Sequence, residues 1–458
     1  MRVTEHELSR LLDTGGLLTG DDVHARAAGI WDPSPLEADS LVRPRTTDEV
    51  AAILALCHAR GQPVVTHGGL TGLVQGAQTR AGDLVLSTER MTKIEDVDAA
   101  GRTMTVQAGV TLQGAQEAAE AAGLQLALDL GARGSCTIGG NLATNAGGNR
   151  VIRYGMARDQ VLGLEAVLAD GTVLSSMNHM IKNNAALDLK QLFIGSEGIL
   201  GVITRAVLRL RERPASRCTA LVAANDLQAV IGLLKHCDAR LGGTLSAFEV
   251  MWQDFYRLVT GPEANRQPPL ENDHAHYVLI ESEGGDAKGD PARFEAVLAD
   301  ALEAGLAVDA VVAASGRERE ALWALRDDVE MTNSRGPSFT FDVSLRVADM
   351  EAYLARVRTR LARAFPGAEV WVFGHLGDGN LHIVVATGAG DDATRERVER
   401  AVYEPLADIG GSISGEHGIG LEKKSWLHLS RSEAEIETLR TLKATLDPRG
   451  ILNPGKVI

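Results

Sequence analysis

The chain has 458 residues, a formal net charge of −15, and 45% hydrophobic residues. This length exceeds one ordinary core, so two or three domains are expected. The acidic balance, with no run of lysine and arginine, argues against a nucleic-acid or anionic-membrane surface. No apolar run reaches 18 residues, and the N-terminal stretch lacks a signal-peptide core. We therefore expect no transmembrane helix and no secretory signal.

Four cysteines are spread along the chain without a CxxC pair: Cys57, Cys136, Cys218 and Cys237. Their spacing fits no disulfide framework. It indicates reduced thiols and a cytoplasmic location.

The first part of the chain reads as an α+β region with glycine-rich turns. Residues 1–40 are polar and predicted to be helical. A helix is expected over 48–60, with Thr46 or Thr47 as its cap and Glu49 available for a capping box. Hydrophobic patterning predicts strands over 62–67, 83–91, 104–110, 162–174 and 201–210, and a helix over 112–124. Together these elements predict a first domain over 1–212.

A change in composition at 211–226 introduces a second α+β region. Helices are predicted over 227–241, 291–305, 317–331 and 350–365. Strands are predicted over 276–284, 308–315, 338–347, 369–377 and 380–387. This pattern gives a second domain over 213–405, followed by a mostly helical segment over 406–458.

A glycine-rich loop follows the strand predicted at 62–67. Gly68, Gly69, Gly72 and Gly76 free the backbone to expose several N–H groups, and Thr71 adds a hydroxyl. A concave set of such donors binds phosphate. The spacing is neither the Rossmann nor the P-loop pattern, so an ordinary surface turn is an equal alternative on this loop alone.

A second loop over 131–155 is rich in small residues. Its paired glycines, Gly139–Gly140 and Gly147–Gly148, would let the backbone pass close to a large flat ligand. Ser135, Thr137 and Thr144–Asn145 supply polar tips. Together with a third stretch over 193–204, this loop suggests an extended dinucleotide lying between the loops.

Six stretches in order resemble one flavoprotein family. They are TNAGGNRVIRYG, LGLEAVLADG, LFIGSEGILGVIT, FGHLGDGNLH, SGEHGIG and DPRGILNPGK. The chain resembles the vanillyl-alcohol-oxidase/p-cresol-methylhydroxylase family, in its D-2-hydroxyacid dehydrogenase branch. The resemblance implies an α+β fold. It would combine a two-subdomain FAD-binding domain of p-cresol-methylhydroxylase type with an α+β substrate domain that has an antiparallel sheet. The helical C-terminal segment would complete the active site.

The resemblance further implies FAD, with its pyrophosphate on 68–72 and its ring system near 135–148 and 197–203. The implied cofactor-binding residues are Thr66, His67, Gly68, Gly69, Leu70, Thr71, Gly72, Ser135, Thr137, Gly139, Gly140, Ala143, Thr144, Asn145, Gly148, Glu197, Gly198, Gly201, Ile203 and Asn453. Some relatives bind FAD covalently through a histidine after the paired glycines. Leu70 stands at that position, so the expected FAD is non-covalent, and His67 reads as a solvated or backbone-bonded histidine.

His375 and His382 bracket a turn of Gly377, Asp378, Gly379 and Asn380. The turn breaks the strand, so both rings can face one point, and neutral imidazoles are common ligands for divalent cations. Glu416 is a candidate third ligand, which would leave an open coordination position. Two histidines bonded to backbone are the alternative, and Asp378 and Asn380 are further candidate ligands. The family carries a zinc-like ion on matching residues, which favours the metal site.

The resemblance implies oxidation of a D-2-hydroxy acid to the 2-oxo acid. His417 is the expected general base, and a residue that only orients Glu416 is its alternative role. Arg326 is expected to clamp the substrate carboxylate, unless it only pairs with Asp327 or Asp328. Thr340, Asn380 and Tyr154 are candidate substrate residues.

The residues around this predicted site leave the preferred acid open. Thr340 and Val384 depart from the pattern of 2-hydroxyglutarate enzymes. D-lactate or a related acid is therefore at least as plausible as D-2-hydroxyglutarate, with Arg346 as a substitute cation.

Three other classes compete with this reading. One is a non-redox FAD enzyme of the alkyl-dihydroxyacetone-phosphate synthase type, although the adjacent histidines of those enzymes are absent here. Another is a metal hydrolase, and a third is a partner-dependent subunit like that of glycolate oxidase. The cysteines do not fit an iron–sulfur site, so electrons are expected to leave for a separate quinone, electron-transfer flavoprotein or cytochrome. A homodimer is one option for the oligomeric state.

Overall fold

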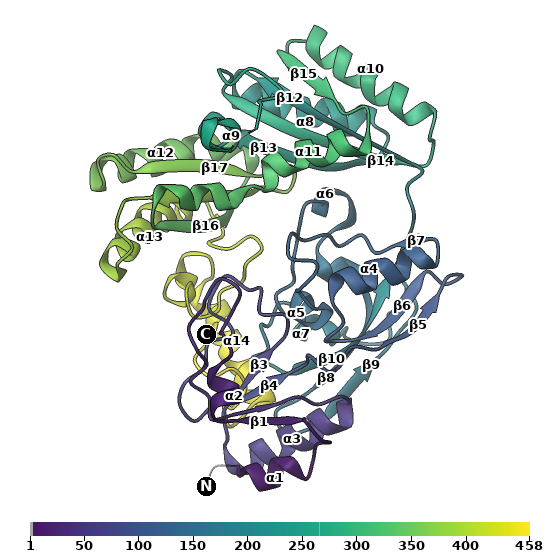
Figure 1. The fold of residues 1–458 in the computed structure, drawn as a ribbon, viewed down its shortest axis with the longest axis vertical. Coiled ribbons are helices and arrows are strands. Elements are labelled where there is room, and N and C mark those ends of the chain that lie inside the picture. The colour runs from purple at the N-terminus through teal and green to yellow at the C-terminus, as the bar shows by residue number, and fades with distance from the viewer. Residues whose placement is uncertain (1–2, 265) are drawn as a thin grey trace. The chain divides into compact units, whose positions relative to one another are not determined.

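The computed structural model describes residues 3–264 and 266–458, which divide into two compact units (Figure 1). Unit 1 contains the chain up to Gly148, Gly155–Arg213 and Glu416–Ile458. Unit 2 contains Asn149–Tyr154 and Pro214–Gly415. The chain therefore passes between the units four times. The short excursion Asn149–Tyr154 was not expected from the sequence, and the expected boundary at 405/406 falls inside helix α13 (Asp392–Ala407).

Unit 1 begins with a four-stranded sheet in the order β1 (Leu17–Thr19), β2 (Ser40–Val42), β4 (Leu84–Ser87), β3 (Val64–His67). Strands β2 and β3 both run parallel to β4, which requires crossover connections. Helix α3 (Thr47–Arg60) provides one of these connections and buries Val50, Ile53, Leu54 and Cys57. These positions recur at helical spacing, so the helix presents one apolar face to the core.

The N-terminal region differs from its prediction in two respects. Residues 3–40 hold only the short helices α1 (Glu5–Ser9) and α2 (Asp21–His24) besides β1, so the expected extended helical region is wrong. Thr46 caps α3 by accepting the Glu49 N–H at 3.2 Å. The Glu49 carboxylate accepts the Arg45 N–H instead of the Thr46 N–H, so the expected capping box does not form.

The second sheet of unit 1 is antiparallel, in the order β5 (Ile94–Asp98), β6 (Thr103–Gln107), β10 (Val202–Arg209), β8 (Val161–Val167), β9 (Val173–Ser176). Its core includes residues from helices α4 (Leu112–Ala121), α5 (Ile138–Ala143) and α7 (Lys190–Phe193). Strands β7 (Leu124–Gln125) and β11 (Arg211–Glu212) form a separate pair.

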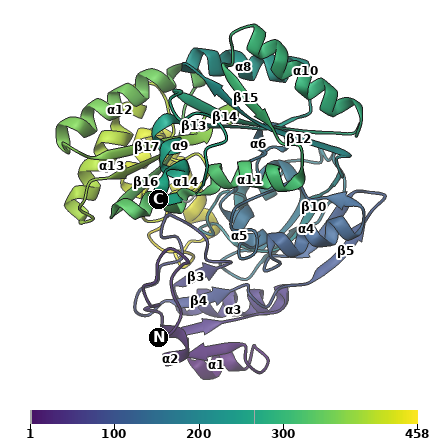
Figure 2. The same ribbon diagram turned by 45° about the horizontal axis from the view of Figure 1, so that its top comes forward.

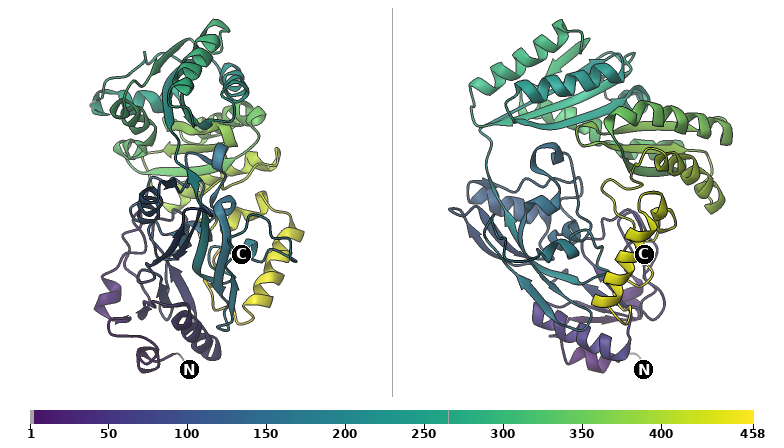
Figure 3. Two further views of the ribbon diagram at one scale, coloured as in Figure 1. Left: turned by 90° about the vertical axis from the view of Figure 1, so that its right-hand side faces the viewer. Right: turned by 180° about the vertical axis from the view of Figure 1, so that it is seen from behind.

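The C-terminal segment completes unit 1. Helix α14 (Glu433–Leu446) is the long yellow helix of Figure 3, and it follows a 3₁₀ helix over Lys424–Leu429. Leu446 packs against the core of the second sheet, and Leu452 bridges to Val64 of β3. The remainder of this segment is irregular, so the mostly helical prediction holds only in part.

Unit 2 is built on one seven-stranded sheet. The order is β15 (Asp309–Val312), β12 (Ser216–Ala224), β14 (His276–Gly284), β13 (Leu245–Trp252), β17 (Glu369–His375), β18 (Asn380–Ala386), β16 (Ser338–Ser344). Every neighbouring pair is antiparallel, which confirms the predicted antiparallel sheet. The sequence analysis missed β12 and β13.

Six helices of eight or more residues surround this sheet: α8 (Leu227–Arg240), α9 (Gln253–Thr260), α10 (Gly289–Glu303), α11 (Gly316–Asp327), α12 (Met350–Ala364) and α13. Helices α8 and α10 lie side by side (Figure 2), joined by an ion pair between Arg240 and Asp300. Helix α11 ends at Asp327, earlier than the predicted 331. The short helix α6 (Val151–Tyr154) lies in the excursion.

The described residues contain no helix that is both long enough and apolar enough to cross a membrane.

Candidate active site

The first glycine-rich loop of unit 1 offers free backbone donors. Within residues 3–264 and 266–458, none of the N–H groups from Gly68 to Gly72 donates to a protein acceptor. The hydroxyl of Thr66, at the start of this loop, is buried and has no hydrogen-bond partner. Polar groups left without partners need a ligand or water. The loop therefore fits an anionic group such as a pyrophosphate.

The first and second loops lie against each other at Gly68 and Gly69, whereas a dinucleotide was expected between the loops. A Cβ added to Gly69 would overlap the Ser135 carbonyl oxygen, and one added to Gly68 would lie 2.8 Å from Thr137 Oγ1. The Thr137 hydroxyl caps α5 by accepting the Gly140 N–H at 3.3 Å. In the second loop several glycine N–H groups are already bonded within the protein, as at Gly139, Gly140 and Gly148.

Half of the eight described non-glycine residues with left-handed backbone are predicted cofactor residues. Four predicted cofactor residues have positive φ: Leu70 at 57°, Asn145 at 50°, Glu197 at 51° and Asn453 at 41°. Such conformations cost free energy and persist where the surroundings impose them, often at functional sites. Asn453 imposes part of this geometry because it accepts the Thr66 N–H at 3.0 Å and donates to the Glu197 carbonyl at 2.7 Å.

The remaining predicted cofactor residues fall into two groups. Gly139, Ala143, Thr144, Gly148 and Gly198 belong to the loops or to the ends of α5. Ile203 is buried in the core on β10, and Gly201 approaches the Phe193 ring, so an added Cβ would lie 2.8 Å from it. These last two residues support the loops from beneath.

His67 is buried and bonded to backbone. Its Nε2 lies 2.8 Å from the Ala77 carbonyl oxygen, to which it donates. Burial lowers the pKa of His67 to about 4, so the ring is neutral at pH 7. This placement matches the expectation of a backbone-bonded histidine.

In unit 2, His375 ends β17 and His382 lies on β18. Both side chains are buried, and their ring centroids are 5.3 Å apart. The pairing of Phe373 with His382 explains this, because His375 lies two residues beyond Phe373 on the same face of the sheet. The turn between them therefore brings the two imidazoles together as the sequence analysis predicted.

Glu249 on β13 is the main side chain that sequence reasoning missed. Its carboxylate accepts from His375 Nδ1 at 2.7 Å and from Arg326 Nε at 2.8 Å. Burial raises the pKa of Glu249, but His375 and Arg326 outweigh burial and hold that pKa at about 2. The Nδ1–H tautomer leaves His375 Nε2 unprotonated, which is the form a metal ligand needs.

Arg326 lies at the end of α11 and is almost fully buried. Its Nη2 lies 3.1 Å from His375 Nε2, and its Nη1 lies 3.5 Å from Asp327. Its guanidinium carbon lies 5.4 Å from the centre of the Phe373 ring. The cation is therefore fixed beside the histidine pair. The ion pair with Asp327, which was the alternative to a substrate clamp, is present, but the shorter bond is to Glu249.

Two carboxylates of β14, Glu281 and Glu283, bind side chains of α11 and of the segment Asn149–Tyr154. Glu281 accepts from Trp323 Nε1 at 3.0 Å and from Arg150 Nε at 2.9 Å. Tyr154 donates its hydroxyl to Glu283 at 2.8 Å, and burial together with that carboxylate raises the pKa of Tyr154. The Tyr154 hydroxyl is thus bonded to a protein carboxylate, and its role toward substrate stays a prediction.

The chain leaves unit 2 beside Asp342 on β16. Asp342 accepts the Gly415 N–H at 3.0 Å and the Asn380 amide at 2.7 Å. Glu416 and His417 are the next two residues, so this anchor at Gly415 lies immediately before them. Asn380 Oδ1 is buried without a hydrogen-bond partner.

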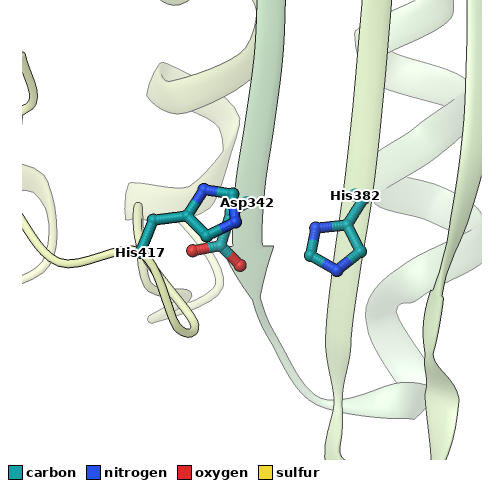
Figure 4. A group of neighbouring side chains, drawn as sticks. All are labelled: Asp342, His382 and His417. Atoms are coloured by element: carbon teal, nitrogen blue, oxygen red, sulfur yellow. The ribbon is translucent and has the colours of Figure 1, made fainter. Parts of the chain in front are cut away.

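Three candidate ligands lie together within unit 2. The rings of His375 and His382 have centroids 5.3 Å apart, and Asp342 pairs with His382 across β16 and β18. Figure 4 shows Asp342 and His382 on these neighbouring strands. Nitrogen and carboxylate donors in one buried cluster fit a divalent cation such as Zn²⁺.

Two further predicted substrate groups are solvent-exposed. Thr340 lies on β16, where it pairs with Val384. Arg346 follows β16 with its side chain 77% exposed, and it bonds to Asp349 at 2.7 Å. Neither residue places a buried second cation near the histidine pair.

Comparison with known proteins shows the family of the chain. A family model for FAD linked oxidases, C-terminal domain, matches residues 213–457, and one for an FAD binding domain matches 38–176. The D-2-hydroxyglutarate dehydrogenase of Xanthomonas citri pv. viticola is 40% identical over 432 residues, covering 93% of this chain and 90% of the relative. The chain belongs to the FAD-linked oxidases. It is an FAD-dependent oxidoreductase.

A second relative supports this family assignment, and a solved structure supports the fold. The mitochondrial D-2-hydroxyglutarate dehydrogenase of Bos taurus is 41% identical over 420 residues, covering 91% of this chain and 76% of the relative. The structure of p-cresol methylhydroxylase with substrate bound matches with a TM-score of 0.78 at 16% identity, covering 99% of this chain and 97% of that one. The predicted p-cresol-methylhydroxylase type of fold is confirmed.

Proposed function

We propose that this FAD-linked oxidoreductase oxidises a D-2-hydroxy acid to the 2-oxo acid with the help of a divalent metal ion. One observation carries the proposal: His375, one of a buried pair of histidines, and the buried Arg326 share a single carboxylate, Glu249. A 2-hydroxy acid presents a carboxylate and a neighbouring hydroxyl, which are the groups that such a cation and metal site recognise.

The cofactors supply the chemistry that side chains lack. When bound, FAD accepts the electrons, and a divalent ion favours loss of the hydroxyl proton. Thr66 and the Gly68–Gly72 loop would hold FAD, without a covalent bond because Leu70 offers no nucleophile. His375, His382 and Glu416 would hold the metal ion, and Asn380 Oδ1 is a further candidate ligand.

Side chains of the protein orient the substrate, remove the hydroxyl proton and hold one another in place. The Arg326 guanidinium pairs with the substrate carboxylate and fixes its orientation. His417 removes the hydroxyl proton, so the carbon that loses electrons becomes a carbonyl. Glu249 keeps His375 in one tautomer and keeps Arg326 in place. Electrons then pass to a separate acceptor, and the predicted cytoplasmic location is part of the same proposal.

Two observations favour different acids. The relatives named D-2-hydroxyglutarate dehydrogenase favour the five-carbon dicarboxylate. Val384 beside His382 and the exposed position of Arg346 favour a smaller acid such as D-lactate, because no second buried cation lies near the described histidine pair.

The test is anaerobic reduction of the purified, FAD-loaded protein by a panel of D- and L-2-hydroxy acids. We expect D acids to bleach the flavin absorbance, chelator treatment to stop bleaching, and added Zn²⁺ or Mn²⁺ to restore it. The fastest acid identifies the substrate class. A yellow protein that no 2-hydroxy acid bleaches would contradict the proposal and favour the non-redox or partner-dependent alternatives.

A further inference from the structure

Glu197 lies in the turn between α7 and β10 of unit 1 with a left-handed backbone, φ 51°. Its backbone is fixed from two directions. The N–H donates to the Ala143 carbonyl at 2.8 Å, and the carbonyl accepts from Asn453 Nδ2 at 2.7 Å. Because both backbone groups are bonded, the direction of the side chain is set.

Both carboxylate oxygens of Glu197 bind the backbone of one segment. Oε1 accepts the Ile419 N–H at 2.7 Å, and Oε2 accepts the Gly420 N–H at 2.8 Å. The carboxylate also lies close against Gly418, where an added Cβ would be 2.9 Å from the Glu197 carboxyl carbon. A carboxylate that accepts two N–H groups makes strong, charge-assisted hydrogen bonds.

The segment that Glu197 holds follows the proposed catalytic pair directly. Ile419 is two residues after His417 and three after Glu416. The other end of the segment is fixed as well, because the Glu416 carboxylate accepts the Gly148 N–H at 2.6 Å. All of these residues belong to unit 1. Glu197 therefore holds the backbone just after the pair, and the Gly148 N–H holds the Glu416 side chain.

We propose that Glu197 is a positioning residue that holds Glu416 and His417 ready for the divalent ion. This inference rests on the proposed function. Glu197 acts through the 419–420 backbone and does not touch the reacting atoms. Two acceptor oxygens are essential to the role, since a glutamine would offer one acceptor and turn an NH₂ group toward the second N–H.

The experiment compares Glu197→Gln with the wild-type enzyme, both loaded with FAD. Zn²⁺ affinity is measured by competition with a chromogenic chelator, FAD content by absorbance, and kcat and KM with the best acid. We expect Zn²⁺ affinity to fall by about 10–100-fold, as when partners of metal ligands are removed, with a parallel fall in kcat and unchanged FAD content.

Glu165→Gln is the matched control. Glu165 lies on β8 of the same unit, is also buried, and accepts from Thr47 at 2.6 Å and Ser175 at 3.0 Å. This control separates general destabilisation from positioning, because it should lower the melting temperature without changing Zn²⁺ affinity.

The outcomes are distinguishable. Wild-type enzyme that binds no Zn²⁺ would overturn the metal part of the proposed function and this inference with it. Wild-type binding with unchanged affinity in Glu197→Gln would overturn the inference alone. So would loss of FAD in step with Zn²⁺, because it would assign Glu197 to the cofactor. If Glu197→Gln does not fold, Glu197→Asp retains the charge but shortens its reach: lowered Zn²⁺ affinity supports the inference, and unchanged affinity overturns it.

Discussion

The two candidate sites differ in which part of the polypeptide forms them: main chain in unit 1 and side chains in unit 2. In unit 1 the FAD loops use main chain: unbonded N–H groups from Gly68 to Gly72, close glycine contacts and left-handed residues. In unit 2 the polar groups are side chains on neighbouring strands and one helix, joined through Glu249. A backbone site tolerates changes of side chain but not an added Cβ, whereas a site of buried charges tolerates no loss of a partner.

The largest expected effect tests the backbone half of this comparison. Gly69→Ala should yield a colourless protein, because the new Cβ would overlap the Ser135 carbonyl and that neighbour is backbone, which cannot move aside cheaply. FAD content after purification is the measurement. Gly131→Ala, where an added Cβ has nothing within 4 Å, is the control and should stay yellow.

The next largest effect is expected for a substitution in the side-chain site of unit 2. His382→Ala should lower turnover by at least about 100-fold while the protein stays yellow, since even groups that only support a metal ligand contribute 10–100-fold. Steady-state kinetics and flavin absorbance measure both properties. The exposed His428, changed to Ala, should leave turnover unchanged. Near-normal turnover in His382→Ala would remove this residue from the proposed site.

Removing the Glu249 carboxylate, which His375 and Arg326 share, should mainly lower the free energy of unfolding. Glu249→Ala removes the nearer carboxylate partner of the buried Arg326 and leaves the longer contact with Asp327; loss of one partner of a buried ion pair costs about 3–5 kcal/mol in comparable cases. Urea unfolding should show this loss, and Glu249→Gln, which keeps one acceptor, should show less. A loss below about 1 kcal/mol in Glu249→Ala would mean that Arg326 has another adequate partner.

The smallest expected effect is a change in the pH dependence of the free energy of unfolding, tested with one histidine in each unit. Burial lowers the pKa of His67 in unit 1 and of His276 in unit 2 to about 4. As pH falls from 6.5 toward 4, the unfolded chain binds protons that the folded chain does not, so the free energy of unfolding falls. His67→Gln and His276→Gln should each flatten this dependence. An unchanged slope in either variant would show that its histidine titrates normally.

The sequence predicted the parts of the site that are encoded locally. The glycine loops and the His375–His382 turn depend on neighbours within about ten residues, and both were recognisable. Glu249 was not, because its histidine partner is 126 residues away and β13 is buried on both faces. A strand without alternating polar residues gives no period-two pattern, which is also why β12 was missed. The bonds between Glu197 and the 419–420 backbone likewise join residues more than 220 positions apart.

The four passages of the chain between the units have a consequence for biosynthesis. Unit 2 has all its residues once Gly415 has emerged, but unit 1 still lacks Leu452, which bridges to Val64, and Asn453, which bonds to Thr66. The N-terminal loops must therefore wait until Leu452 and Asn453 have left the ribosome before their flavin-binding geometry is complete. Cofactor capture thus becomes a late event, and a nascent chain stalled in α14 would be a partly folded, colourless protein.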